Sequence, residues 1–143
     1  MNSKTDHYKR AVATRARDLA LAKVLIEAAT TRYGFNPSDI TSPMRFSDMC
    51  EARYAIAYIL KSSTNLSLRS IAKTLGRSDH TTTLGALKHV NEDPDRFNPI
   101  IIAITDIAKA NARTLKASNY IQAEAGVRGL LARGEGEGVV VTL

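Results

Sequence analysis

The chain has 143 residues, enough for one domain with a buried core and an additional helix or tail. Its 20 Lys and Arg exceed its 14 Asp and Glu, and the resulting net charge of +6 favours a polyanionic partner but is small for a DNA-packaging protein. A single cysteine, Cys50, excludes a disulfide within a monomer. No apolar run approaches the roughly 20 residues of a membrane span and no secretory signal is evident, so we expect a cytoplasmic protein with no membrane contact.

Residues 5–33 are predicted to form one long helix. Apolar side chains recur there at intervals of three and four residues, as on one face of a helix: Val12, Ala16, Leu19, Ala22, Ile26, Ala29 and Tyr33. Residues 1–33 hold seven Lys or Arg against three Asp or Glu, so +4 of the net charge of +6 lies here. An electrostatic contact with nucleic acid and a solvated outer face would explain this charge equally well.

The next part of the chain predicts a turn, a loop and a second helix. Gly34 is expected to end the first helix and residues 36–39 to form a turn. Residues 40–46 are expected to form a loop that contains Pro43 and Arg45. The helix predicted at 47–61 has an apolar inward face that consists of Met49, Ala52, Ile56, Ile59 and Leu60.

Residues 66–90 show the pattern of a helix, a tight turn and a second helix. Ser67 can cap the first helix, because its hydroxyl can accept from a free N–H of the first turn. Gly76 follows the last apolar residue, where helices often end in a left-handed conformation. Ser78 or Asp79 can cap the second helix. The apolar positions expected on its inward face are Leu84, Leu87 and Val90.

The C-terminal part predicts one more helix and a tail. Residues 91–94 and Pro99 are expected to interrupt helical structure, and the last helix to span about 99–117. From residue 126 onward the chain holds five of its eight glycines. We therefore predict an all-α fold with one helical domain at 1–125 and a Gly-rich flexible tail at 126–143.

The second helix of the 66–90 segment begins with five small or medium polar residues, Asp79-His80-Thr81-Thr82-Thr83. A protein core does not need such a run, whereas a surface that contacts phosphates and base edges does. Threonine hydroxyls can donate to phosphate, and the N-terminus of a helix attracts anions. Arg77 can reach a phosphate or a guanine, and Asp79 can accept from cytosine or simply cap the helix. The alternative for the whole motif is a helical hairpin that binds nothing.

Signals of catalysis or metal binding are absent from the sequence. No phosphate-binding loop of the type G-x-x-x-x-G-K-[ST] occurs, and no G-x-G-x-x-G. His7, His80 and His89 are widely separated, and Cys50 has no second cysteine beside it, so no metal-ligand spacing is present. We expect neither an enzyme nor a bound cofactor or metal.

Residues 53–87 resemble the C-terminal duplex-DNA-binding domain of the bacterial replication initiator DnaA. The resemblance lies in Ala52-Arg53, Ala57-Tyr58-Ile59-Leu60-Lys61, Thr64-Asn65-Leu66-Ser67-Leu68, Gly76 and, above all, Asp79-His80-Thr81-Thr82. Tyr33-Gly34-Phe35 and Asp39-Ile40 extend it upstream, so that it covers about residues 22–93. In this family the Asp-His-Thr-Thr run begins the recognition helix of a helix-turn-helix.

The resemblance implies roles for individual residues. The expected contacts with bases come from Arg77, Ser78, Asp79, His80 and Thr81. The expected contacts with the DNA backbone come from Thr82, Thr83, Arg53, Lys61, Leu68 through its main-chain N–H, and Arg69. Arg45 lies in the loop where the family has a basic residue that enters the minor groove.

Three departures from the family pattern affect these expectations. The family turn is usually Gly-Gly-Arg before Asp-His, whereas this chain has Gly76-Arg77-Ser78, which predicts a different sequence preference. The loop before the second helix contains one arginine instead of a basic cluster, which predicts weaker anchoring in the minor groove. The family's nucleotide-binding motor has no counterpart in the sequence, so ATP hydrolysis is not expected.

The leading hypothesis is a bacterial, nucleoid-associated protein that binds double-stranded DNA sequence-specifically and regulates transcription or replication, at sites like those of the initiator. The alternative is a helical interaction module that forms a homodimer through its flanking helices, or docks onto a replication or transcription protein. Non-specific DNA packaging is a weaker third idea, because the net charge is modest.

Overall fold

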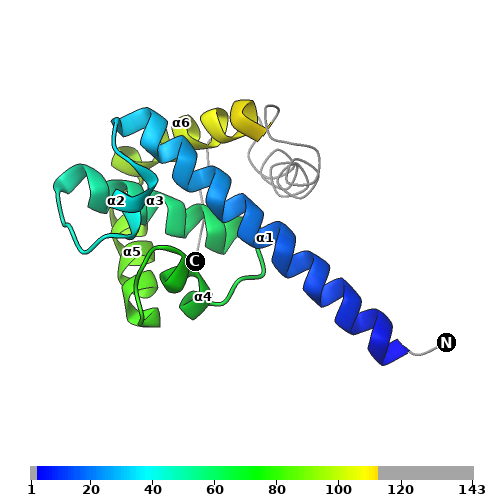
Figure 1. The fold of residues 1–143 in the computed structure, drawn as a ribbon. Coiled ribbons are helices and arrows are strands. Elements are labelled where there is room, and N and C mark those ends of the chain that lie inside the picture. Colours follow the sequence, from blue (N-terminus) through cyan, green and yellow to red (C-terminus); the bar gives the residue numbers. More distant parts are fainter. Residues whose placement is uncertain (1–2, 113–143) are drawn as a thin grey trace.

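Six helices make up most of the part of the chain that the computed structural model describes, residues 3–112, with side chains from residue 6 onward (Figure 1). They are α1 (Ser3–Tyr33), α2 (Pro37–Thr41), α3 (Ser47–Ser63), α4 (Leu68–Thr74), α5 (His80–Glu92) and α6 (Pro94–Ala112). No strand occurs among the described residues, so the predicted all-α class is confirmed. The tail predicted at 126–143 and the last helix beyond residue 112 lie outside the described residues.

Helix α3 lies at the centre of the core, where it packs against α1, α4, α5 and α6. All five side chains predicted on its inward face are buried. Its residues 55–60 are buried on every side, which is the pattern of a helix enclosed by its neighbours. The other elements of the domain are therefore positioned by the faces they present to α3.

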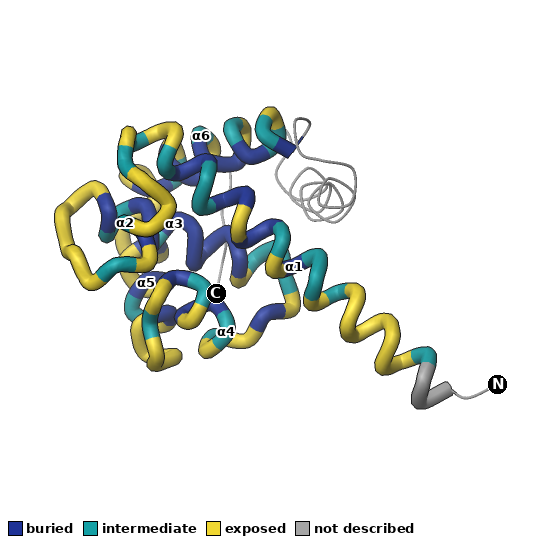
Figure 2. The backbone as a smooth tube through the Cα atoms, in the orientation of Figure 1, coloured by how far each residue is buried: buried dark blue, intermediate teal, exposed yellow. Residues whose placement is uncertain are grey.

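Helix α1 packs on α6 with its C-terminal half only. The buried positions there are Leu21, Ala22, Val24, Leu25, Ala28 and Ala29. Residues 7–13 are exposed without interruption, and Figure 2 shows this N-terminal half extending away from the body of the molecule. The inward face predicted from spacing is therefore partly wrong, since Val12 is 51% and Leu19 41% exposed. Periodicity identified the helix but not how far its neighbours extend along it.

Two local predictions based on proline are wrong. Pro37–Thr41 forms the short helix α2 where a turn and a loop were expected, and its residue Ile40 is completely buried. The interruption expected at 91–94 is confirmed at Asp93, between the end of α5 at Glu92 and the start of α6 at Pro94, whose fixed φ suits the first helical position. Pro99 lies inside the same helix, where burial of Ile100 and Ile101 outweighs the lost backbone hydrogen bond.

Candidate nucleic-acid interface

Helices α4 and α5 form the predicted helix-turn-helix, and the three local signals that defined it are confirmed. The Ser67 hydroxyl accepts from the backbone N–H of Ser70 at 3.1 Å and caps α4. Gly76 has a φ of +76°. Asp79, not Ser78, caps α5, with its carboxylate Oδ1 accepting from the Thr81 N–H at 3.0 Å. The two helices are therefore joined by a tight turn over 75–79.

The turn is packed directly on α2. A Cβ atom at Gly76 would lie 2.1 Å from the carbonyl oxygen of Thr41, so no side chain fits there. Arg77 is half-buried, and its Nη1 donates to the carbonyl oxygen of Ser42 at 3.0 Å. These contacts connect the turn to the loop at 42–46, which carries Arg45.

The first turn of α5 presents its polar side chains to solvent. Ser78, Asp79, His80, Thr81 and Thr82 are all exposed. The Thr81 N–H is the main reason that the pKa of Asp79 lies below its ordinary value, so this carboxylate is an acceptor and not a donor near neutral pH. Nδ1 of His80 lies 3.1 Å from Oδ1 of Asp79. The His80 ring and the Thr81 hydroxyl thus lie against the capping carboxylate, whereas the Ser78 and Thr82 side chains make no hydrogen bond within the described residues.

Thr83 does not belong to the exposed surface, and its expected contact with a DNA backbone is corrected. Its side chain is 1% exposed, and its hydroxyl donates to the Leu68 carbonyl oxygen at 2.8 Å. Because a hydroxyl has one proton, none is left for a phosphate. Thr83 instead holds α5 against the beginning of α4. Leu84, predicted to face inward, is 47% exposed, whereas Leu87 and Val90 are buried as predicted.

Arg53, also expected to contact a phosphate, is 6% exposed. Its guanidinium donates to four backbone carbonyl oxygens: Asp39 at 3.0 Å, Ile40 at 2.7 Å, Ser42 at 2.9 Å and Met44 at 2.6 Å. Burial, followed by the nearby charge of Arg77, lowers its pKa below the ordinary arginine value. The expectation of a free phosphate anchor is therefore corrected: Arg53 holds the end of α2 and the following loop on α3.

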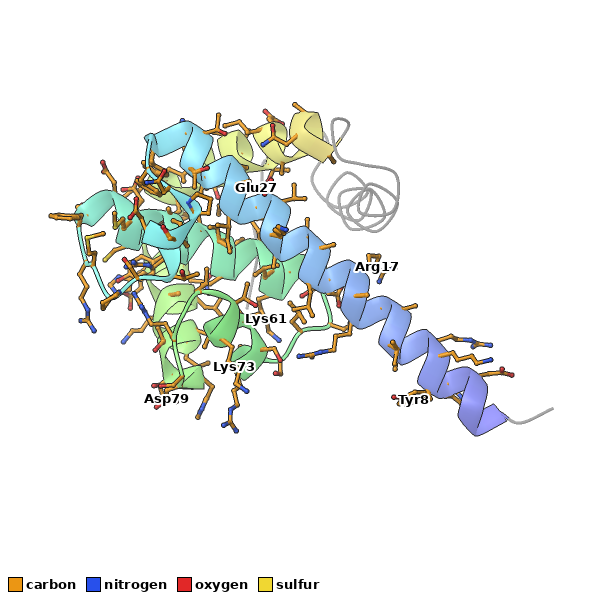
Figure 3. All side chains as sticks on the ribbon, viewed as in Figure 1. Tyr8, Arg17, Glu27, Lys61, Lys73 and Asp79 are labelled. Carbon is orange, nitrogen blue, oxygen red and sulfur yellow. The ribbon has the colours of Figure 1, made fainter. Side chains whose placement is uncertain are left out.

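The remaining expected anchors are accessible. Arg45, Lys61 and Arg69 are exposed, and Leu68 begins α4, where first-turn N–H groups lack helical partners. Figure 3 shows Lys61 and Asp79 on the side of the molecule occupied by α4 and α5, opposite α6. The structure thus brings one basic residue of α3 to the same side as the first turn of α5.

One basic residue on this side was not among the expected contacts. Lys73 is exposed on α4, where Figure 3 labels it. It follows Arg69 by four residues, so the two lie on one face of α4. That spacing is visible in the sequence and could have identified Lys73.

Residues 3–112 contain neither a metal-ligand cluster nor a membrane-spanning helix. No group of three or more His, Cys, Asp or Glu side chains is arranged to hold a metal ion in this part of the chain. No helix within it is both long enough and apolar enough to cross a bilayer.

The family model described as the bacterial dnaA protein helix-turn-helix matches residues 22–90. Residues 22–90 are a DnaA-type helix-turn-helix domain. The match begins within α1 and ends within α5, so it contains every contact between the helix-turn-helix, α2 and α3 described above. A helix-turn-helix of this kind is a DNA-binding element whose second helix occupies the major groove.

Similar curated proteins are chromosomal replication initiator proteins DnaA. Those of Thermodesulfovibrio yellowstonii and Campylobacter concisus are 32% and 31% identical over 87 and 85 residues, which cover 61% and 59% of this chain and 20% of each relative. That of Rickettsia canadensis is 37% identical over 62 residues, or 43% of this chain and 13% of the relative. The chain therefore spans about a fifth or less of the length of these relatives. No solved structure gives a significant match.

Proposed function

We propose that this protein binds double-stranded DNA sequence-specifically through its DnaA-type domain and regulates transcription or replication from the nucleoid. It acts by occupying its sites, and not by hydrolysing ATP. Helix α5 enters the major groove, where Asp79, His80 and Thr81 contact base edges. Arg45 enters the adjacent minor groove.

The observation that carries this proposal is the contrast within the first turn of α5. Four successive residues, 79–82, are exposed and polar, whereas Thr83 is buried and bonded to α4. The helix is thus held rigidly from behind while its N-terminal side chains remain available. A preorganised helix loses little conformational entropy on binding, which favours a specific interface. Groups that suit phosphate are also exposed on the neighbouring helices, Lys61 on α3 and Arg69 and Lys73 on α4, in addition to Thr82 in the turn itself.

The test is a binding titration with two duplexes of equal length. One carries the binding site of a DnaA initiator and the other a scrambled sequence, and each is measured across a salt series. We expect tighter binding to the first duplex and affinity that falls steeply with salt for both. Equal affinity for the two duplexes would refute sequence-specific binding to initiator-type sites. Absence of binding even at low salt would refute DNA binding altogether.

Two substitutions separate contacts with bases from contacts with phosphates. His80→Ala should cost about 1–3 kcal/mol on the preferred duplex and reduce the preference. Lys61→Ala should weaken binding to both duplexes equally and lower the salt slope by about one. If both variants behave alike, the proposed division of roles is wrong.

A second candidate function is self-association through α1, which a separate observation favours. Tyr8 is 71%, Val12 51% and Leu19 41% exposed, and their spacing places them along one side of the projecting helix. Sedimentation equilibrium of the full chain and of Val12→Asp tests this function. A dimer that the substitution dissociates would support it, and a monomer at high concentration would exclude it.

A further inference from the structure

Three arginines converge on one cavity behind the first turn of α5. The cavity has a volume of about 180 Å³ and lies where α3, α5 and the 42–46 loop meet. Arg45 reaches it from the loop, Arg53 from α3 and Arg77 from the helix-turn-helix turn. Thr82, from the exposed first turn of α5, also lines it. The cavity therefore borders the surface proposed to contact DNA.

The charges around this cavity are not balanced by the protein. No Asp or Glu is among the residues that line it. Arg53 and Arg77 both donate to the carbonyl oxygen of Ser42, at 2.9 and 3.0 Å, so their guanidinium groups are close neighbours. Like charges at this separation disfavour each other, and an anion between them would offset the cost.

Enough hydrogen-bond donors remain to hold such an anion. A guanidinium has five N–H donors. Arg53 uses its donors on four backbone carbonyls, whereas Arg77 makes one side-chain hydrogen bond. Within the described residues, Arg45 has no side-chain hydrogen bond or ion pair. Arg45, Arg77 and the Thr82 hydroxyl are therefore the groups that can turn to a ligand.

We propose that this cavity binds one phosphate group, with Arg77 as its charged donor and Thr82 as a neutral one, while Arg45 stays available to the minor groove. A planar guanidinium suits a tetrahedral phosphate because two of its N–H groups can bond two oxygens together. The phosphate is a phosphodiester of the duplex bound by α5, so the inference rests on the proposed function. It assigns Arg77 to the DNA backbone, one of the two contacts open from the sequence, although the family resemblance implied a contact with a base.

The experiment replaces phosphates of the preferred duplex one at a time by neutral methylphosphonates. For the unmodified protein, one position near the α5 contact should lower affinity about tenfold, the size of one lost charge-assisted hydrogen bond. Arg77→Gln should lower affinity for the unmodified duplex by a similar factor. The methylphosphonate at that position should then cost the Arg77→Gln variant nothing further.

Arg69→Gln is the matched control, because Arg69 is exposed on α4 and does not line the cavity. Arg69→Gln should still lose affinity about tenfold when the methylphosphonate is at the position assigned to Arg77. If Arg77→Gln and Arg69→Gln lose affinity equally at every methylphosphonate, Arg77 contacts no particular phosphate and the proposal is overturned. Thermal unfolding of both variants shows whether either change acts through the fold.

A titration without DNA distinguishes this inference from the proposed function. Inorganic phosphate is added to the full chain while the arginine Nε–H resonances are recorded by NMR. A saturable shift of the Arg77 resonance, absent when phosphate is replaced by chloride, supports the cavity as a phosphate site even if no duplex binds. If the duplex binds but neither phosphate nor the methylphosphonates affect Arg77, the cavity proposal fails and the proposed function stands.

Discussion

The buried guanidinium of Arg53 gives the sharpest prediction about stability. Arg53→Met keeps a long apolar side chain on α3 but removes all four donors to the chain between Asp39 and Met44. The Asp39 carbonyl still accepts from Ser42, and the Ser42 carbonyl still accepts from Arg77. The carbonyl oxygens of Ile40 and Met44 lose the partner that the structure gives them.

The size of the effect follows from these two carbonyls. A buried acceptor left without a partner costs about 1–3 kcal/mol. Ile40 is completely buried, whereas Met44 is 39% exposed and water can replace its lost donor. We therefore expect the free energy of unfolding to fall by about 1–3 kcal/mol, or the melting temperature by roughly 10 °C. Arg53→Lys should lie between, because an ammonium has three donors on a shorter reach.

Urea unfolding followed by circular dichroism measures this loss, with Lys61→Met as the matched control on the same helix. Lys61 is exposed, so its replacement should leave stability nearly unchanged and lower the salt slope of DNA binding by about one. The reasoning is refuted if Arg53→Met unfolds at the same urea concentration as the original chain. It is refuted most clearly if that variant also loses one unit of salt slope, which would make Arg53 a phosphate anchor.

Three further predictions concern Thr83, Gly76 and Tyr33. Thr83→Val should lower the free energy of unfolding by about 1 kcal/mol and leave DNA affinity unchanged. Thr82 is exposed, so Thr82→Val should lower DNA affinity and leave the free energy of unfolding unchanged. Urea unfolding and the duplex titration measure the two quantities. Gly76→Ala should destabilise the fold by more than the roughly 1–2 kcal/mol of left-handed strain, because the added Cβ meets Thr41. Gly34 also has a positive φ, +81°, but open space around it, so Gly34→Ala should cost the strain alone. Thermal unfolding measures both. Burial, then the hydrogen bond to Glu51, raises the pKa of Tyr33 to about 12 from 10.0, so its contribution to stability is complete below pH 10 and is lost as pH rises through 12. Urea unfolding across this range should show a smaller alkaline loss for Tyr33→Phe, and an identical loss would exclude the shift.

Much of the helix-turn-helix could be predicted because its signals are local. The Ser67 hydroxyl caps α4 by accepting from the N–H of Ser70, three residues later. The Asp79 carboxylate caps α5 by accepting from the N–H of Thr81, two residues later. The left-handed conformation of Gly76 likewise depends on the residue itself. Such interactions are complete within one turn of chain. The sequence alone therefore predicted the turn between α4 and α5, and left only Ser78 or Asp79 open as the cap of α5.

The roles of long or amphipathic side chains were decided by the tertiary structure. Arg53 and Lys61 are both basic residues of α3, yet one is buried under the 42–46 loop and the other is exposed. Thr82 and Thr83 are adjacent and chemically identical, yet only Thr83 faces α4. Sequence spacing places residues on a helix face but does not show which neighbouring element covers that face, or for how many turns. Burial and hydrogen-bond partners depend on elements distant in the chain, so only the packed fold separates the residues that hold the interface from those available to contact DNA.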